Sequence, residues 1–265
     1  MSTGQIVLIF IVDMRVTNEV PSSWQDLQNK VCKYLNECGY HAESPKVIET
    51  VRGPVEVDVF ATSDDEMLSQ FICECKFWDT RVPQEKIHAF RTVVQDSGSM
   101  IGIFISKAGY QKGALKAANC SNVLLKDWNG FISMIAKKWV KNRFRAVQKL
   151  GDPLGTYTNY LDVPIEKLAT KKAVQECMRL QDKYKEPYYL ARSLESGFHR
   201  PEDPVELDGF LFNDFCSLFD YLEMVFVQGV REFEEFFAKN PITDWNPDLD
   251  ESMHFESCIL DYLTS

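Results

Sequence analysis

The chain has 265 residues, of which 45% are hydrophobic and 26% are charged, and its net charge is −10. These proportions are typical of a globular protein and allow one large domain or two small ones. No apolar run reaches the roughly 18 residues that span a membrane, so we expect no membrane segment.

The first elements in chain order are strands and one helix. An apolar run at residues 5–14 predicts a buried strand. Residues 21–38 predict an amphipathic helix, because a serine cap signal precedes apolar residues at helical spacing. Residues 40–51 predict one or two strand segments around Pro45, and residues 52–54 predict a turn.

The strand predicted at residues 67–77 carries a charged pair inside an apolar run. Side chains alternate with period two along a strand, so Cys73 and Cys75 share one face while Glu74 and Lys76 share the other. Charges are rarely buried in a sheet unless they are paired or bind something. This pair therefore marks either an ion pair on a solvated edge strand or a functional site.

The preceding strand, predicted at residues 54–61, alternates valines with Glu56 and Asp58. If it pairs with the charged strand, Asp58 can approach Glu74. The prediction is then a cluster of two carboxylates and an ammonium on one face of the sheet.

The following residues alternate between helix and strand. The predicted segments are a helix at 83–97, a buried strand at 100–106, a turn at 107–110, a short helix at 111–119, a strand at 123–128 and a helix at 131–150. This order predicts an α/β fold, in which a mixed β-sheet is flanked by helices.

A segment rich in glycine and proline, residues 151–155, predicts a boundary between domains 1–150 and 151–265. The first domain has a net charge of +3 and the second a net charge of −13. The second domain is predicted to be mainly helical, at residues 164–186 and 209–239, with an apolar face running from Leu211 to Val230. An acidic helical region of this kind suits regulation, oligomerisation or partner binding.

The eight cysteines form no CxxC pair and have no histidine at zinc-finger spacing. We therefore expect reduced, mostly buried thiols in a cytoplasmic protein.

The residues around the charged pair resemble a nuclease signature. Asp58 is followed after fifteen residues by Glu74-Cys75-Lys76, which looks like the PD-(D/E)xK pattern. The order of that strand, a helix and the segment GIFISKAGYQKGALKAA resembles the Mrr-like restriction endonuclease family, over about residues 22–130. The resemblance implies a restriction-endonuclease-like core, a DNA endonuclease activity and a role in antiviral or foreign-DNA defence.

The same resemblance implies a divalent metal, Mg²⁺ or Mn²⁺, held by Asp58, Glu74 and the backbone carbonyl of Cys75. Lys76 would then orient or polarise the attacking water. The residue types agree with this chemistry, because oxygen ligands suit these hard cations and a metal lowers the pKa of water and neutralises charge on a phosphate.

The sequence departs from the family on the first helix, where Gln28 takes the place of a glutamate that many relatives have there. Glu56 could supply a second carboxylate instead, or could simply be solvated. Gln84, on the helix after the charged strand, is a further candidate for the catalytic site, as in some relatives.

Candidate nucleic-acid contacts fall in two segments. Near the turn at residues 106–113, Ser106, Lys107 and Lys112 either grip a phosphate or close the fold. The basic run at residues 137–149 either meets a phosphate backbone or the acidic second half of the chain. Its candidate contacts are Lys137, Lys138, Lys141, Arg143 and Arg145.

Two other functions remain open at this stage. A non-catalytic module with the same fold could bind nucleic acid, a protein partner or a second copy of the chain through the acidic half. An RNA-cleaving effector is the third possibility. The intact set of Asp58, Glu74 and Lys76 favours the DNA endonuclease.

Overall fold

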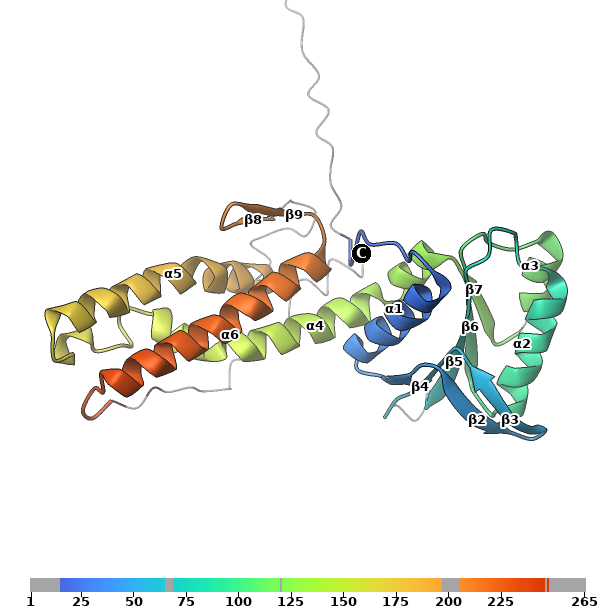
Figure 1. Ribbon diagram of the computed structural model, residues 1–265, viewed down its shortest axis with the longest axis horizontal. Helices are drawn as coiled ribbons and strands as arrows, with labels where there is room; N and C mark the ends of the chain where they lie inside the picture. The colour runs from blue at the N-terminus through green and yellow to red at the C-terminus, as the bar shows by residue number, and fades with distance from the viewer. Residues whose placement is uncertain (1–14, 65–68, 120, 197–204, 246, 248–265) are drawn as a thin grey trace, which may run out of the picture. The chain divides into compact units, whose positions relative to one another are not determined.

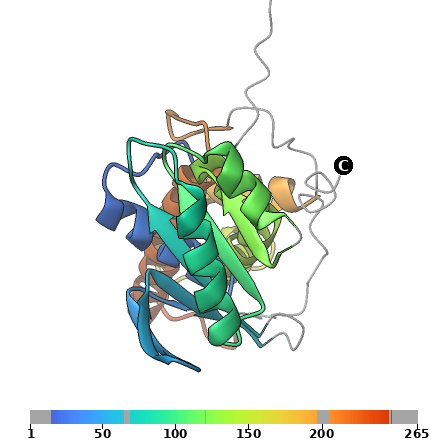
Figure 2. The same ribbon diagram turned by 90° about the vertical axis from the view of Figure 1, so that its right-hand side faces the viewer.

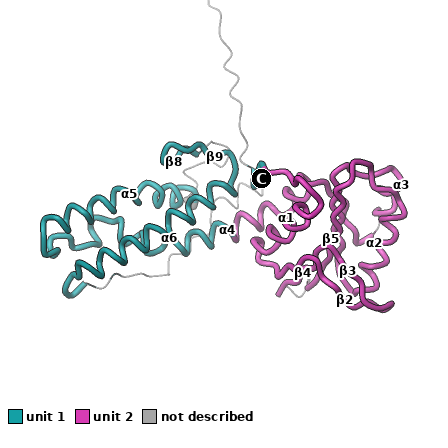
Figure 3. Tube along the Cα trace, in the orientation of Figure 1, with its two compact units in different colours: residues 1–18, 143–265 teal, residues 19–142 magenta. Residues whose placement is uncertain are grey.

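The computed structural model describes residues 15–64, 69–119, 121–196, 205–245 and 247. The predicted strand at residues 5–14 and most of the acidic tail lie outside these residues. The chain divides into two compact units, which are coloured separately in Figure 3. Unit 2 comprises Glu19–Asn142, and unit 1 comprises Met1–Asn18 and Arg143–Ser265.

A five-stranded mixed sheet forms the centre of unit 2, with strand order β1-β4-β5-β6-β7 (Figure 1). Pairing is antiparallel from β1 to β5 and parallel from β5 to β7. The strands are β1 (His41–Glu43), β4 (Val59–Thr62), β5 (Gln70–Lys76), β6 (Ile101–Ser106) and β7 (Val123–Lys126). The charged strand of the sequence, β5, is thus the central one, and the predicted mixed sheet is confirmed.

Helices cover both faces of this sheet, as Figures 1 and 2 show for α1 and α2. They are α1 (Trp24–Glu37), α2 (Gln84–Asp96), α3 (Lys112–Ala118) and the first part of α4 (Trp128–Thr158). The α4 part packs on α1, since the rings of Trp128 and Trp139 lie 5.9 and 6.1 Å from that of Tyr34. The predicted helices around the sheet are therefore confirmed.

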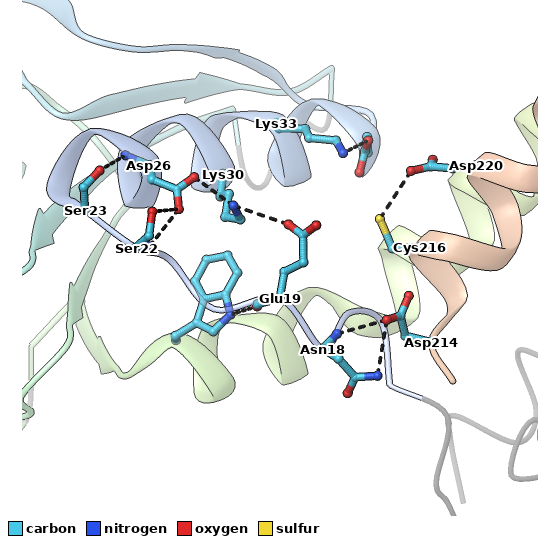
Figure 4. Close-up of polar contacts among 12 residues, drawn as sticks. Asn18, Glu19, Ser22, Ser23, Asp26, Lys30, Lys33, Asp214, Cys216 and Asp220 are labelled. Carbon is cyan, nitrogen blue, oxygen red and sulfur yellow. Dashed lines mark hydrogen bonds and ion pairs between the residues drawn. The ribbon is translucent and has the colours of Figure 1, made fainter. Parts of the chain in front are cut away.

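The start of α1 shows why this helix begins where it does (Figure 4). Ser23 is the N-cap, and its hydroxyl accepts a hydrogen bond from the backbone N–H of Asp26. Asp26 in turn pairs with Lys30, which also contacts Glu19. A capping serine satisfies a free N–H group of a helix start, and an acidic residue in the first turn interacts favourably with the positive end of the helix dipole.

The single strand predicted at residues 54–61 is wrong, because the chain bends at Asp58. Its first part is β3 (Gly53–Val57), which pairs only with β2 (Lys46–Thr50) in a separate two-stranded sheet. Its second part is β4, in the main sheet. The bend breaks the period-two relation between Glu56 and Asp58, so their side chains are not on a common strand face.

The two faces of β5 are both packed. Ile72 belongs to a buried cluster with Phe104 of β6, Ile87 and Phe90 of α2 and Ala114 of α3. On the opposite face, Phe71, Cys73 and Cys75 are also buried. A strand covered on both faces reads as a nearly continuous apolar run, which matches the sequence apart from the charged pair.

Unit 1 is mainly helical. Its elements are the second part of α4, a short 3₁₀ helix η2 (Ile165–Lys167), α5 (Lys171–Ser196), a hairpin of β8 (Val205–Leu207) and β9 (Phe210–Phe212), and α6 (Phe215–Lys239). Asp214 is the N-cap of α6, where it accepts a hydrogen bond from the backbone N–H of Ser217. It also accepts one from the backbone N–H of Asn18 (Figure 4).

The predicted helix at 209–239 therefore starts later than expected. Leu211 is an exposed residue of β9 instead of part of the buried helix face, because the turn at Asp208 and Gly209, both with positive φ, folds the chain into the hairpin. Phe215, Phe219 and Phe226 are buried on α6 as predicted.

Residues 151–155, where the sequence predicts a boundary, lie inside α4. Gly151 and Gly155 face other helices of unit 1 at close range. A Cβ added at Gly151 would lie 2.6 Å from a ring carbon of Phe226, and one at Gly155 would lie 2.6 Å from the hydroxyl of Tyr188. The glycines thus permit close helix packing, and the unit boundary falls earlier, between Asn142 and Arg143.

Candidate active site

The charged pair of β5 lies at the carboxyl end of the central strand. Glu74 and Lys76 point to the same face, and the ammonium of Lys76 forms an ion pair with Oε1 of Glu74. Their side chains are 24% and 20% exposed, so both are largely removed from water. Because both side chains are largely buried and β5 is the central strand, the pair is not an ion pair on a solvated edge strand.

Asp58 joins this pair from the bend between β3 and β4. Its Oδ2 accepts a hydrogen bond from the backbone N–H of Cys75 at 2.7 Å and lies 3.9 Å from Nζ of Lys76. The β4–β5 ladder begins at the pairing of Val59 with Cys73, so the carboxylate of Asp58 occupies the place where the next ladder bond to Cys75 would form. The bend is what places this carboxylate beside β5.

Gln28 approaches the site from α1. It is 1% exposed, and its Nε2 donates a hydrogen bond to Oδ1 of Asp58 at 2.6 Å. Both oxygens of Asp58 therefore have a donor, one from the backbone and one from a buried amide. The residue that stands in the place of the family's helix glutamate supports Asp58 and does not add a charge.

The electrostatics of the site are dominated by Glu74. Burial, together with the neighbouring Asp58 carboxylate, raises the pKa of Glu74, while Lys76 and Lys86 of α2 lower it. The net shift is upward, so the nearby cations do not fully compensate for the loss of water around the two carboxylates. A further positive charge at this position would be stabilised.

The donor set fits a hard divalent cation. In a strand the N–H and C=O of one residue point to the same side, so the carbonyl of Cys75 faces the side on which Asp58 lies. Two carboxylates and a carbonyl are ligands that Mg²⁺ and Mn²⁺ accept, with water or phosphate completing the shell. Among the residues that the structure describes, no cluster of three or more His, Cys, Asp or Glu side chains could hold a metal ion.

In the described part of the chain, no hydrogen bond joins Gln84 or Glu56 to the carboxylates of Asp58 and Glu74. Gln84 is the exposed first residue of α2, and its Nε2 lies 2.9 Å from Nε2 of His88. Its side chain also lies against Gly113 of α3, where a Cβ would meet Oε1 at 2.6 Å. Glu56 is exposed on the β2–β3 hairpin, opposite Val47.

The candidate nucleic-acid contacts near the turn after β6 differ in their exposure. Ser106 is fully buried, and its hydroxyl donates to the carbonyl of Gly109 at 3.1 Å, so it closes the turn and is not open to a ligand. Lys107 is partly exposed and pairs with Asp79 at 2.7 Å, close to the ring of Phe77. Lys112 is exposed at the first position of α3.

The basic residues of α4 fall in both units. In unit 2, Lys137 and Lys138 are exposed and Lys141 is half-buried. In unit 1, Arg143 is 15% exposed and pairs with Asp220 at 2.6 Å and Glu223 at 2.5 Å, while Arg145 is exposed.

The ion pairs of Arg143 bear on whether the basic run at residues 137–149 contacts a phosphate backbone or the acidic second half of the chain. At Arg143 the acidic half of the chain already pairs with one guanidinium nitrogen, Nη2. Within unit 2, Nζ of Lys138 lies 3.7 Å from the ring centroid of Tyr40, whose ring lies 5.0 Å from that of Phe71. Phe71 is near the start of β5, about 16 Å from Lys76 at ~3.3 Å per residue.

Two residues near the site were not singled out from the sequence. Lys86 lies in the first turn of α2 and acts on the Glu74 carboxylate. Trp78, two residues beyond Lys76, has its ring centroid 5.9 Å from Nζ of Lys76. The sequence signal that could have identified Lys86 and Trp78 is their position shortly after the charged strand.

Comparison with known families agrees with this geometry. Residues 21–135 match the family model Mrr_cat, described as restriction endonuclease. The match covers the sheet, the helices α1, α2 and α3, the start of α4 and all of Gln28, Asp58, Glu74 and Lys76. The resemblance to this family and the α/β fold with a mixed sheet, both expected from the sequence, are therefore confirmed for residues 21–135.

Other comparisons add little. A search of the curated proteins gave no significant match. A crystal structure of a protein of unknown function, AF1548, is similar over 66% of this chain and 100% of its own length, with 15% identity and a TM-score of 0.37. That TM-score is too low to support an inference about fold or function. No helix in the described part of the chain is long and apolar enough to cross a membrane.

Proposed function

We propose that the protein is a metal-dependent endonuclease that hydrolyses DNA phosphodiester bonds. The observation that carries the proposal is the meeting of Asp58, Glu74 and Lys76 at the end of β5, inside a domain that matches a restriction endonuclease model. Asp58, Glu74 and the carbonyl of Cys75 would hold Mg²⁺ or Mn²⁺. The upward pKa shift of Glu74 supports this, since burial and the Asp58 carboxylate outweigh the effect of Lys76 and Lys86 on the charged form of Glu74.

Hydrolysis adds the oxygen of a water to phosphorus and breaks one phosphorus–oxygen ester bond, and the proton that the water loses balances the one that the leaving alkoxide takes up. A bound metal supplies a lower pKa for water and neutralises charge on the phosphate. Gln28 and the N–H of Cys75 fix Asp58 in one orientation.

Lys76 has the second role. Its ammonium can donate hydrogen bonds to the attacking water and to a phosphate oxygen, and its charge stabilises the negative charge that develops on the phosphate. Its ion pair with Glu74 holds it at this position before substrate binds. Gln84, on α2, has the proposed role of contacting substrate or water when DNA is bound.

The exposed cations Lys112, Lys137 and Lys138 of unit 2 are the proposed contacts to the DNA backbone, and Lys107, Lys141 and, in unit 1, Arg145 are further candidates. The ion pairs of Arg143 and the burial of Ser106 argue for structural roles at those two positions. We further propose a cytoplasmic role in defence against foreign DNA. The six described cysteines are free thiols, which supports that location.

The test is incubation of the purified protein with plasmid DNA and with single-stranded RNA, with and without Mg²⁺ or Mn²⁺. Glu74→Gln and Lys76→Ala are compared with Glu49→Gln, which removes an exposed carboxylate from the β2–β3 hairpin. We expect metal-dependent plasmid cleavage by the wild type and by Glu49→Gln only.

Three other outcomes would refute the site or favour a different function. Cleavage that persists in both Glu74→Gln and Lys76→Ala would refute the site. Cleavage of RNA alone would identify an RNA-cleaving effector. DNA binding without cleavage under every condition would identify the non-catalytic module instead, which Gln28 in place of a carboxylate favours.

A further inference from the structure

Two exposed tryptophans distinguish the surface of unit 2. Among its described residues, the other exposed large hydrophobic side chains are all aliphatic. Trp24 is 48% exposed and Trp78 is 37% exposed. An indole ring usually gains from burial, so two rings left in solvent on one domain are a reason to look for a ligand with a flat apolar face.

Trp78 lies directly beside the candidate active site. It follows Lys76 by two residues, and the ammonium of Lys76 lies 5.9 Å from its ring centroid. The backbone on both sides of it is fixed. The N–H of Lys107 donates to the carbonyl of Lys76 at 3.0 Å, and the N–H of Val82 donates to the carbonyl of Gly109 at 2.9 Å. The loop therefore presents Trp78 from an anchored segment.

Trp24 lies one helical turn before Gln28 on α1. It precedes Gln28 by four residues, so the two side chains lie on one face of the helix, about 6 Å apart along its axis at ~1.5 Å per residue. Gln28 is bonded to Asp58. Trp24 and Trp78 thus come from two different elements, and each lies close in the chain to a residue of the candidate site, Trp24 to Gln28 and Trp78 to Lys76.

We propose that Trp24 and Trp78 form a stacking site for unpaired nucleobases next to the bond that is cut. The inference rests on the proposed function, whose substrate it narrows to DNA with unpaired bases. Stacking on aromatic rings is how proteins bind single-stranded DNA, because every base has a π-face. In a duplex the base faces are covered by neighbouring base pairs, so a ring at this place has nothing to stack on unless a base is unpaired or flipped out.

The positions of charge agree with this substrate. The ammonium of Lys76, which is proposed to contact a phosphate, lies 5.9 Å from the ring centroid of Trp78. This distance is less than two base steps of ~3.4 Å each. Lys86 of α2 adds a second cation close to Glu74. A strand that places its phosphate at Lys76 therefore brings an adjacent base within reach of the indole.

The test measures binding without catalysis. A short thymidine oligonucleotide and a blunt duplex of the same length are titrated in EDTA against the wild type, Trp24→Leu, Trp78→Leu and Trp78→Phe. Met100→Ala is the matched control. It removes an exposed apolar side chain at the other end of the sheet, where the N–H of Met100 donates to Gln70 at the start of β5.

We expect each leucine variant to bind the single strand about 5- to 150-fold more weakly, with duplex binding unchanged. Trp78→Phe keeps a ring and retains most of the affinity, and Met100→Ala binds as the wild type does. Tryptophan fluorescence of the wild type is quenched by the single strand. A thermal melt of each variant confirms that it is folded.

Two results would overturn the proposal. They are unchanged single-strand binding in both leucine variants and an equal loss of single-strand and duplex binding. Because no cleavage is needed, single-strand binding in EDTA can support the stacking site even if the nuclease activity is absent.

Discussion

The two units of this chain differ in where they place charge. Unit 2 holds Asp58, Glu74 and Lys76 largely out of water at the end of its central strand, where burial raises the pKa of the Glu74 carboxylate. Both units pack aromatic rings in their interiors, and in unit 1 Tyr157 and Phe233 are stacked at 5.1 Å. Its ion pairs, such as Lys183 with Glu232 at 2.9 Å, stay partly exposed.

This contrast separates residues retained for chemistry from residues retained for stability. Buried charges contribute little net stability, because the loss of hydration offsets their attraction. A buried aromatic core contributes directly to the folded state. Substitutions at the candidate site of unit 2 should therefore change activity, and substitutions in the core of unit 1 should reduce stability. The four predictions below run from the largest expected effect to the smallest.

Lys76→Met should reduce DNA cleavage by about 10²- to 10⁴-fold, because positioned proton donors and acceptors contribute effects of that size. The measurement is the initial rate of plasmid nicking in Mg²⁺. Lys116→Met removes an exposed lysine of α3 and should leave the rate unchanged. Equal rates for both variants would remove Lys76 from the site.

Phe226→Ala should destabilise unit 1 by about 3–5 kcal/mol, since it empties a buried position between α6 and α4. Urea denaturation followed by circular dichroism measures the loss. Met224→Ala, two residues away on the same helix but 55% exposed, should change stability by less than about 0.5 kcal/mol. Similar values for the two would contradict a packed core at Phe226.

Gly151→Ala should destabilise unit 1 by up to about 2 kcal/mol. Alanine favours a helix by about 1 kcal/mol, but its Cβ would lie 2.6 Å from a ring carbon of Phe226 and overpack the core by about 1–3 kcal/mol. In the Phe226→Ala background the ring is gone, so the same substitution should become stabilising. Urea denaturation of the four proteins tests this, and additive effects would contradict close packing at Gly151.

Glu74→Gln should raise the melting temperature of the metal-free protein at neutral pH, in contrast to the core variants of unit 1. The folded-state pKa of Glu74 lies above its ordinary value of 4.5. The protonated form therefore stabilises the fold at low pH, and this contribution is lost as pH rises from about 4.5 through the folded pKa. Glutamine shows no such loss.

The advantage of Glu74→Gln over the wild type should therefore grow across that pH range and then stay constant. Melting curves in EDTA from about pH 3 to about pH 8 measure it. An advantage that is independent of pH would mean that Glu74 is not responsible.

Much of unit 2 could be predicted because its signals are local. Period two along β5 placed Glu74 and Lys76 together, and helical spacing on α1 predicted the helix that carries Gln28. The route by which Asp58 arrives could not be predicted. It depends on the bend that ends β3, and the valines on both sides of Asp58 gave the pattern of an unbroken strand.

Other features depended on tertiary packing. Gly151 and Gly155 have the composition of a linker, and only the rings of Phe226 and Tyr188 explain why a helix needs glycine there. The ion pairs of Arg143 depend on which helix lies opposite. The exposure of Trp24 could not be read from the sequence, because an indole on an amphipathic helix is usually buried.

The most direct test of the central claim is the Mg²⁺ dependence of single-turnover DNA cleavage by the wild type and by Asp58→Asn. Asparagine can keep an oxygen for the N–H of Cys75 but brings no charge to the metal. If Asp58 holds the catalytic ion, Asp58→Asn should need a higher Mg²⁺ concentration and reach a lower maximal rate. An identical rate at every Mg²⁺ concentration would contradict the account.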